Sequence, residues 1–129
     1  MYFRFKRAAF SQARLRIVTL AWLTLLSGAS LQPVRPDFLS AVHREIHWLA
    51  FAGAALLLFA LSSSRRQEVL KALVIFLLGV SVEFLQHLIY RNPLEWCDIG
   101  DDGVAILLSF ALYRLVARAM RRFSALPGT

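Results

Sequence analysis

Four long apolar segments, separated by short polar ones, constrain this chain more than any other feature of its sequence. They run over 17–31, 46–61, 72–89 and 104–117. With its flanking polar residues, each approaches the ~20 residues that a membrane-spanning helix needs, within a range of ~17 to 25. The sequence therefore predicts four spanning helices, at about 15–32, 44–62, 70–90 and 102–119.

Composition agrees with this prediction. Of the 129 residues, 58% are hydrophobic and the mean hydropathy is +0.57, well above the apolar share of an ordinary soluble domain. The loops are short and no internal repeat occurs, so we expect one domain over 1–129. Its fold class is all-α, an integral membrane four-helix bundle. A soluble bundle of buried helices is the alternative, but it would not explain how the charges are distributed.

Basic and non-basic polar segments alternate along the chain. Residues 1–16 carry five basic side chains and no acid, and the segment 62–71 carries three basic side chains against one acid. Acids balance or outnumber bases in the connections around residue 37 and over 91–102, and arginines return in the C-terminal tail. Under the positive-inside rule, both termini are cytoplasmic and the protein is a multi-pass protein of the cell membrane, a bacterial inner or plasma membrane.

The net charge of +7 would also suit a nucleic-acid-binding protein. Such a protein needs a water-exposed basic groove, which this chain can hardly supply, so no nucleic-acid partner is expected. Cys97 is the single cysteine, which excludes an internal disulfide and a zinc–thiolate cluster.

The first apolar segment has a second interpretation, as a cleaved signal peptide. A basic start, an apolar core and the small residues "SGAS" at 27–30 fit that pattern. Cleavage would leave three spans, whereas Trp22 and the length to Gln32 favour a retained helix.

Polar side chains interrupt the third apolar segment near its end. Glu83, Gln86, His87 and Tyr90 recur at i, i+3, i+4 and i+7 and predict one polar stripe on a helix. An ionised carboxylate facing lipid costs several kcal/mol (about 3 on insertion scales), so Glu83 should face protein or water.

The second and fourth segments begin with matching polar residues at the same predicted membrane surface. We expect a cluster at the outer leaflet that binds a ligand. Its candidate residues are His43, Arg44, His47, Glu83, Gln86, His87, Arg91, Asp98 and Asp102.

Three roles remain open for this cluster. It could be a structural network in which Glu83 pairs with Arg44 or Arg91. The two arginines could instead hold the headgroup of a lipid or a lipid-linked glycan. A divalent metal is the third alternative, which would suit a membrane-embedded hydrolase using His43, His47, Glu83 and Asp98; no cofactor is otherwise predicted, and no catalytic residue is assigned.

The same residues resemble the VanZ-like family of small multi-pass membrane proteins. The family pattern has D-K-x-x-H, then E-x-x-Q, an arginine and D-x-x-x-N-x-x-G. This chain has His43-Arg44-Glu45-Ile46-His47, then Glu83-Phe84-Leu85-Gln86, Arg91 and Asp98 through Asp102, within 43–102. His43 stands where the family has aspartate, Asp102 where it has asparagine and Ala105 where it has glycine.

The resemblance implies a multi-pass membrane protein and supplies no established reaction. We therefore predict a protein that binds or senses a cell-envelope lipid or lipid-linked glycan through the outer-leaflet cluster. A metal-dependent hydrolase and a structural subunit with a membrane-protein partner are the alternatives.

Overall fold

The computed structural model describes the backbone of residues 2–30, 43–91 and 93–124, and the side chains of 11–29, 44–91 and 93–122. These residues form four helices and no strand: α1 (Tyr2–Ser30), α3 (His43–Ala60), α4 (Arg65–Tyr90) and α5 (Trp96–Ser124). The all-α prediction is confirmed, with one helix at each predicted apolar segment.

Local sequence explains where α4 begins and ends. Ser64 is its N-cap, and its hydroxyl accepts a hydrogen bond from the Gln67 backbone N–H at 3.3 Å. The Gln67 side chain in turn accepts one from the Ser63 N–H at 2.9 Å, a close variant of the capping box. Arg91 ends the helix in the left-handed conformation, at φ 57°, and Pro93 follows two residues later, where a helix could not continue.

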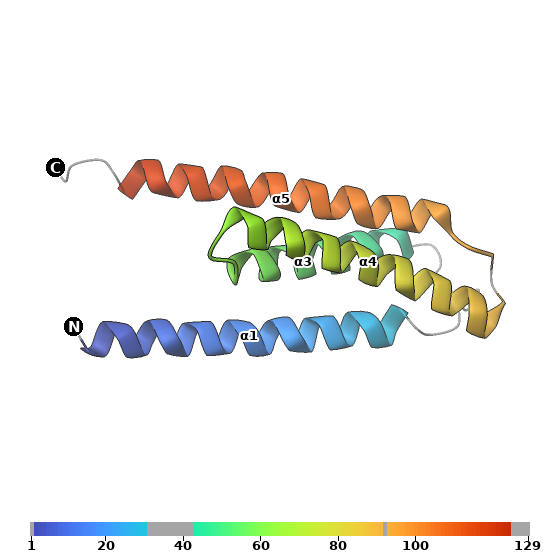
Figure 1. Cartoon of the computed structure of the whole chain (residues 1–129), viewed down its shortest axis with the longest axis horizontal. Coiled ribbons are helices and arrows are strands. Elements are labelled where there is room, and N and C mark those ends of the chain that lie inside the picture. Colours follow the sequence, from blue (N-terminus) through green and yellow to red (C-terminus); the bar gives the residue numbers. More distant parts are fainter. Residues whose placement is uncertain (1, 31–42, 92, 125–129) are drawn as a thin grey trace.

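The helices run side by side, with both termini and the α3–α4 turn at the same end of the molecule (Figure 1). α3 packs against the other three and makes its most extensive contact with α5. Its buried Phe51, Ala54, Ala55 and Phe59 form the centre of the core. Because the alanines are small, neighbouring helices can approach α3 closely there.

α1 packs on α3 through a tryptophan. The indole Nε1–H of Trp22 donates to the Ala50 carbonyl at 2.9 Å. A Cβ built on Gly53 would lie 2.8 Å from Cζ2 of the same indole, so this contact requires the absence of a side chain at residue 53. The small-residue run at 50–55 therefore serves helix packing.

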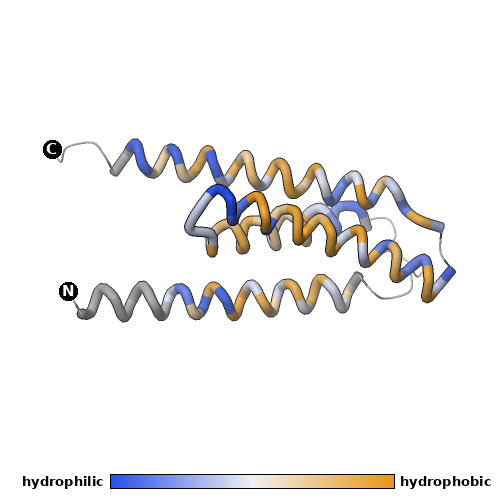
Figure 2. The backbone as a smooth tube through the Cα atoms, in the orientation of Figure 1, coloured by the Kyte–Doolittle hydropathy of each residue, from blue (hydrophilic) through white to orange (hydrophobic). Residues whose placement is uncertain are grey.

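Many large apolar side chains of α4 and α5 face outward, while several carboxylates are buried between the helices. Figure 2 shows that the central parts of both helices consist largely of hydrophobic residues. Within the described residues, α4 and the Trp96–Arg122 portion of α5 are long and apolar enough to cross a membrane. α3 has 18 residues and a polar first turn, which lowers its hydropathy.

Candidate functional site

A group of polar side chains lies between α3, α4 and α5, in the half of the molecule away from the termini. We call it the polar cluster, and it comprises Arg44, His47, Glu83, Gln86, Asp98, Asp101 and Asp102. All of these are buried except Arg44. The prediction that three separate segments would assemble one cluster agrees with this arrangement.

His47 is the centre of the polar cluster. Its Nδ1 lies 3.3 Å from Oδ1 of Asp102, and its ring stacks on Phe51 with 6.0 Å between the ring centroids. One face of the imidazole is therefore packed and one nitrogen is held by a carboxylate. Together these contacts fix the orientation of the ring.

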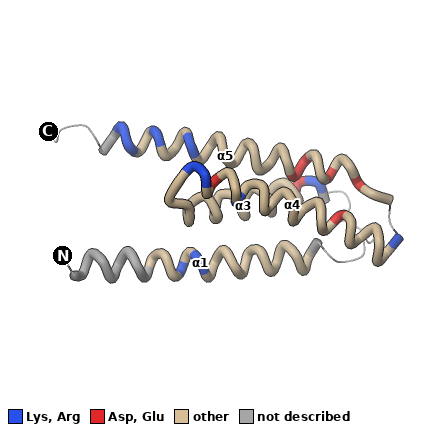
Figure 3. The backbone as a smooth tube through the Cα atoms, in the orientation of Figure 1, with Lys and Arg blue, Asp and Glu red and all other residues tan. Residues whose placement is uncertain are grey.

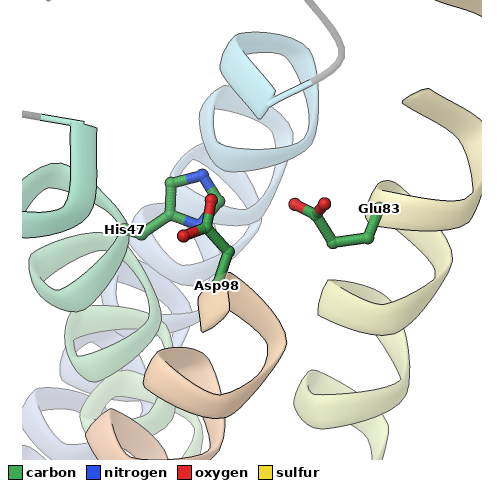
Figure 4. Close-up of side chains that lie close together, drawn as sticks. All are labelled: His47, Glu83 and Asp98. Atoms are coloured by element: carbon green, nitrogen blue, oxygen red, sulfur yellow. The ribbon is translucent and has the colours of Figure 1, made fainter. Parts of the chain in front are cut away.

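Glu83 and Asp98 approach His47 from the other two helices. In Figure 4 the Asp98 carboxylate lies over the imidazole, and the Glu83 side chain reaches toward both from α4. One potential ligand atom from each of the three residues lies within 4.8 Å of the others. The exposed fractions are 6% for His47, 3% for Glu83 and 7% for Asp98, so all three are shielded from solvent.

Arg44 forms its ion pair with Asp101. The guanidinium donates to both carboxylate oxygens, through Nε to Oδ2 and through Nη2 to Oδ1, the latter at 3.0 Å. One alternative paired Glu83 with Arg44 or Arg91, whereas the structure pairs Arg44 with Asp101. Within the described residues, neither a hydrogen bond nor an ion pair to Glu83 is present. Asp101 and Asp102 are consecutive residues of α5, so their side chains point about 100° apart around the helix axis. The two carboxylates therefore meet different partners.

The predicted stripe on α4 is only partly buried. Glu83 and Gln86 lie on the buried face of the helix with Ile75, Gly79 and Val82. His87 is exposed because an i+4 step turns about 40° further around the helix than Glu83, past the edge of the packed face. Tyr90 is also exposed, at the end of α4.

Two other predicted residues are not placed in the polar cluster. Arg91 is exposed at the left-handed C-cap of α4. The side chain of His43 lies outside the described residues, although its backbone begins α3. Of the nine candidates, the structure thus brings together Arg44, His47, Glu83, Gln86, Asp98 and Asp102.

Two residues of the site were not among the candidates. Asp101 follows Asp98 at a D-x-x-D spacing in the polar start of α5, and this spacing was the available signal. Gly79 has no polar group, yet a Cβ on it would lie 2.7 Å from Oδ2 of Asp102. A glycine in the middle of an apolar helix was its signal, because such a residue indicates a close approach.

Charge is separated along the long axis. In Figure 3 the basic residues of the α3–α4 turn and of the end of α5 lie toward the termini, while most acidic residues lie in the other half. Glu68 is the buried acid of the basic end, and its Oε2 lies 3.4 Å from Nη1 of Arg114. The two ends therefore differ in the sign of the charge that predominates.

The polar cluster offers carboxylate oxygens and an imidazole nitrogen in a buried space, together with one solvated guanidinium. Such groups can accept hydrogen bonds from hydroxyls, hold a cation or, at the exposed edge, contact a phosphate. Comparison of the chain with protein-family models, curated proteins and solved structures finds no match.

Proposed function

We propose that this chain is a four-span protein of the cell membrane, with both termini in the cytoplasm. Its polar cluster would then lie near the opposite surface, where it binds the headgroup of a cell-envelope lipid or lipid-linked glycan. The observation that carries the proposal is the apolar surface that α4 and α5 turn outward, together with the carboxylates buried between the helices. Membership of the VanZ-like family stays a prediction that agrees with it.

Two outward-facing surfaces support the membrane environment. Leu73, Val74, Leu77 and Leu88 are exposed on α4, and leucines at 107, 108, 112 and 115 are exposed on α5. In water, contiguous apolar surface of this kind would drive association. In lipid it is the surface expected of a spanning helix, while the polar side chains turn inward.

The charge distribution supports the orientation. The end that contains both termini and the α3–α4 turn is rich in arginine (Figure 3). The positive-inside rule places such an end in the cytoplasm. α1 and α3 would complete the bundle as the other two spans. Arg14 and Arg16 lie near the middle of α1, at the start of its apolar segment, and their long side chains can extend toward the headgroups.

A pair of reporter insertions tests the topology. A reporter after Arg66, in the first turn of α4, should be cytoplasmic, and one inserted near Asn92 should be external. The opposite result would reverse the orientation, and finding both reporters on one side would overturn the membrane proposal.

The exposed edge of the polar cluster supports the choice of ligand. Arg44, Glu45, Trp48 and Leu49 line an open hollow at the start of α3. A guanidinium can pair with phosphate, and an indole offers an apolar face to a sugar ring. Because 71% of the Arg44 side chain is exposed, the guanidinium can contact a ligand while its pair with Asp101 is kept.

Native mass spectrometry of the detergent-purified chain tests this role. The wild-type protein should retain a discrete lipid or lipid-linked glycan, and Arg44→Ala and Trp48→Ala should each reduce its occupancy. Arg66→Ala, which removes an exposed arginine at the opposite end, is the matched control and should keep the wild-type lipid. Equal lipid content in all four proteins would overturn the headgroup proposal.

A further inference from the structure

We infer that His47, Glu83 and Asp98 form a binding site for one divalent transition-metal ion. The inference concerns the buried centre of the polar cluster rather than its exposed edge. It stands whether or not a headgroup binds beside Arg44.

The three donors have the arrangement that a metal site requires. Each comes from a different helix, all are buried, and one ligand atom of each lies within 4.8 Å of the other two. Figure 4 shows the Glu83 carboxylate directed toward His47 and Asp98. Glu83 is 97% buried, as its exposed fraction of 3% shows, and among the described residues it has no hydrogen-bond or ion-pair partner. An ionised carboxylate is costly to bury, and a cation bound beside it would compensate its charge.

The charges of the polar cluster point the same way. Glu83, Asp98 and Asp102 are buried around one imidazole, and the nearby guanidinium of Arg44 is already bound to Asp101. Three carboxylates gathered around one imidazole form a set of acidic ligands in a buried space. Such a set favours a divalent cation.

The contact between His47 and Asp102 has the form of an outer-sphere interaction. Its Nδ1 lies 3.3 Å from Oδ1 of Asp102, so Nε2 is the nitrogen that would coordinate the ion. Metal-binding histidines commonly hold a carboxylate through their other ring nitrogen, which fixes the tautomer and increases ligand basicity. Asp102 thus has a positioning role, and Gly79 gives its carboxylate room.

The donor set also limits the kind of ion. One imidazole nitrogen with two carboxylate oxygens suits zinc and its neighbours in the first transition row, whereas calcium and magnesium prefer oxygen ligands alone. At metal–ligand distances near 2.1 Å, tetrahedral ligand atoms lie about 3.4 Å apart. The donors must therefore close by a little over an ångström, which rotation of the long Glu83 side chain can provide. A fourth position would be left for water or another ligand.

Zinc titration of the full-length chain tests the inference. The protein is purified in detergent without a polyhistidine tag, depleted of metal with a chelator and titrated with Zn²⁺ in a calorimeter. One equivalent should bind saturably. Glu83→Gln and Asp98→Asn should each weaken binding by at least about tenfold, because each removes a charged ligand without changing the side-chain volume much.

Glu68→Gln is the matched control. It alters a glutamate of the same helix that is similarly buried but paired with Arg114 at the other end, and its Zn²⁺ affinity should stay within about twofold of wild type. Circular dichroism confirms the helical content of each variant. Co²⁺ provides a second readout, since the visible absorption of the wild-type complex should change in Glu83→Gln.

Three results would overturn the site: no saturable Zn²⁺ binding by the wild-type chain, unchanged affinity in both Glu83→Gln and Asp98→Asn, or an equal loss in Glu68→Gln. A wild-type chain that binds Zn²⁺ but retains no lipid would uphold the metal site while contradicting the headgroup proposal.

Discussion

Gly79 on α4 faces the carboxylate of Asp102 on α5 so closely that a Cβ on the glycine would lie 2.7 Å from Oδ2. The same Cβ would lie 3.0 Å from Cε1 of Phe51 on α3. One residue without a side chain therefore lets three helices approach one another at the polar cluster. The approach of α4 to its neighbours, and with it the position of Glu83, depends on this glycine.

Gly79→Ala should destabilise the bundle, by about 1–3 kcal/mol in the free energy of unfolding, because the added methyl group forces Asp102 or Phe51 to move. Gly100→Ala is the control, since nothing lies within 4 Å of its Cβ position, and it should be neutral or slightly stabilising. Denaturation in mixed detergent micelles measures both. A loss in Gly100→Ala as large as that in Gly79→Ala would contradict the steric explanation.

The interaction between His47 and Asp102 can be measured with a double-mutant cycle. His47→Gln, Asp102→Asn and the double variant should give a coupling free energy of about 1 kcal/mol, as for a buried hydrogen-bonded pair. The unfolding experiments are done with a chelator present, so that the cycle reports the direct contact alone. Strictly additive effects would show that the 3.3 Å approach contributes nothing to stability.

Alanine variants of Phe59 and Phe84 compare the stability contributed by an interior phenylalanine with that of an outward-facing one. Phe59 is fully buried and contacts Phe110 edge to face, at 5.6 Å between centroids, so Phe59→Ala should cost about 3 kcal/mol of unfolding free energy. Phe84 is 47% exposed on α4, and Phe84→Ala should cost less than about 1 kcal/mol. Equal losses in detergent unfolding would show that Phe84 packs against another protein surface.

Trp22 should hold α1 against α3. Trp22→Ala removes the hydrogen bond to Ala50 and the contact over Gly53, so about 2 kcal/mol of the interaction between these helices should be lost. Hydrogen exchange in α1 should accelerate while exchange in α3 and α5 stays slow. Trp96→Ala, at a tryptophan that is 71% exposed, should leave exchange in α1 unchanged.

The helices themselves followed from the pattern of the sequence. The apolar runs predicted spans at 44–62 and 70–90, which match α3 and the C-terminal end of α4, because hydrophobic patterning is local. α4 begins earlier, at Arg65, where Ser64 caps it. The prediction that α3, α4 and α5 would contribute polar side chains to one place also rested on local evidence, namely which end of each helix carries them.

The rotation of each helix about its own axis could not be predicted from the local sequence. His87 was grouped with Glu83 because i+4 residues share a face, but the packed face of α4 is narrow and is set by Gly79, which reflects contacts with Phe51 and Asp102 on other helices. Asp101 and Asp102 are likewise neighbours in sequence with different partners, and only the rotation of α5 decides which carboxylate meets Arg44. Such choices are made by tertiary packing.

The short turn between α3 and α4 bears on the order in which the protein assembles. Only residues 61–64 separate the two helices, so they can form a hairpin through local contacts as soon as both have been synthesised. That hairpin already contains His47 and Glu83 but neither Asp98 nor Asp102. The polar cluster therefore cannot be complete until α5 packs against this hairpin, so its assembly requires α3, α4 and α5 together.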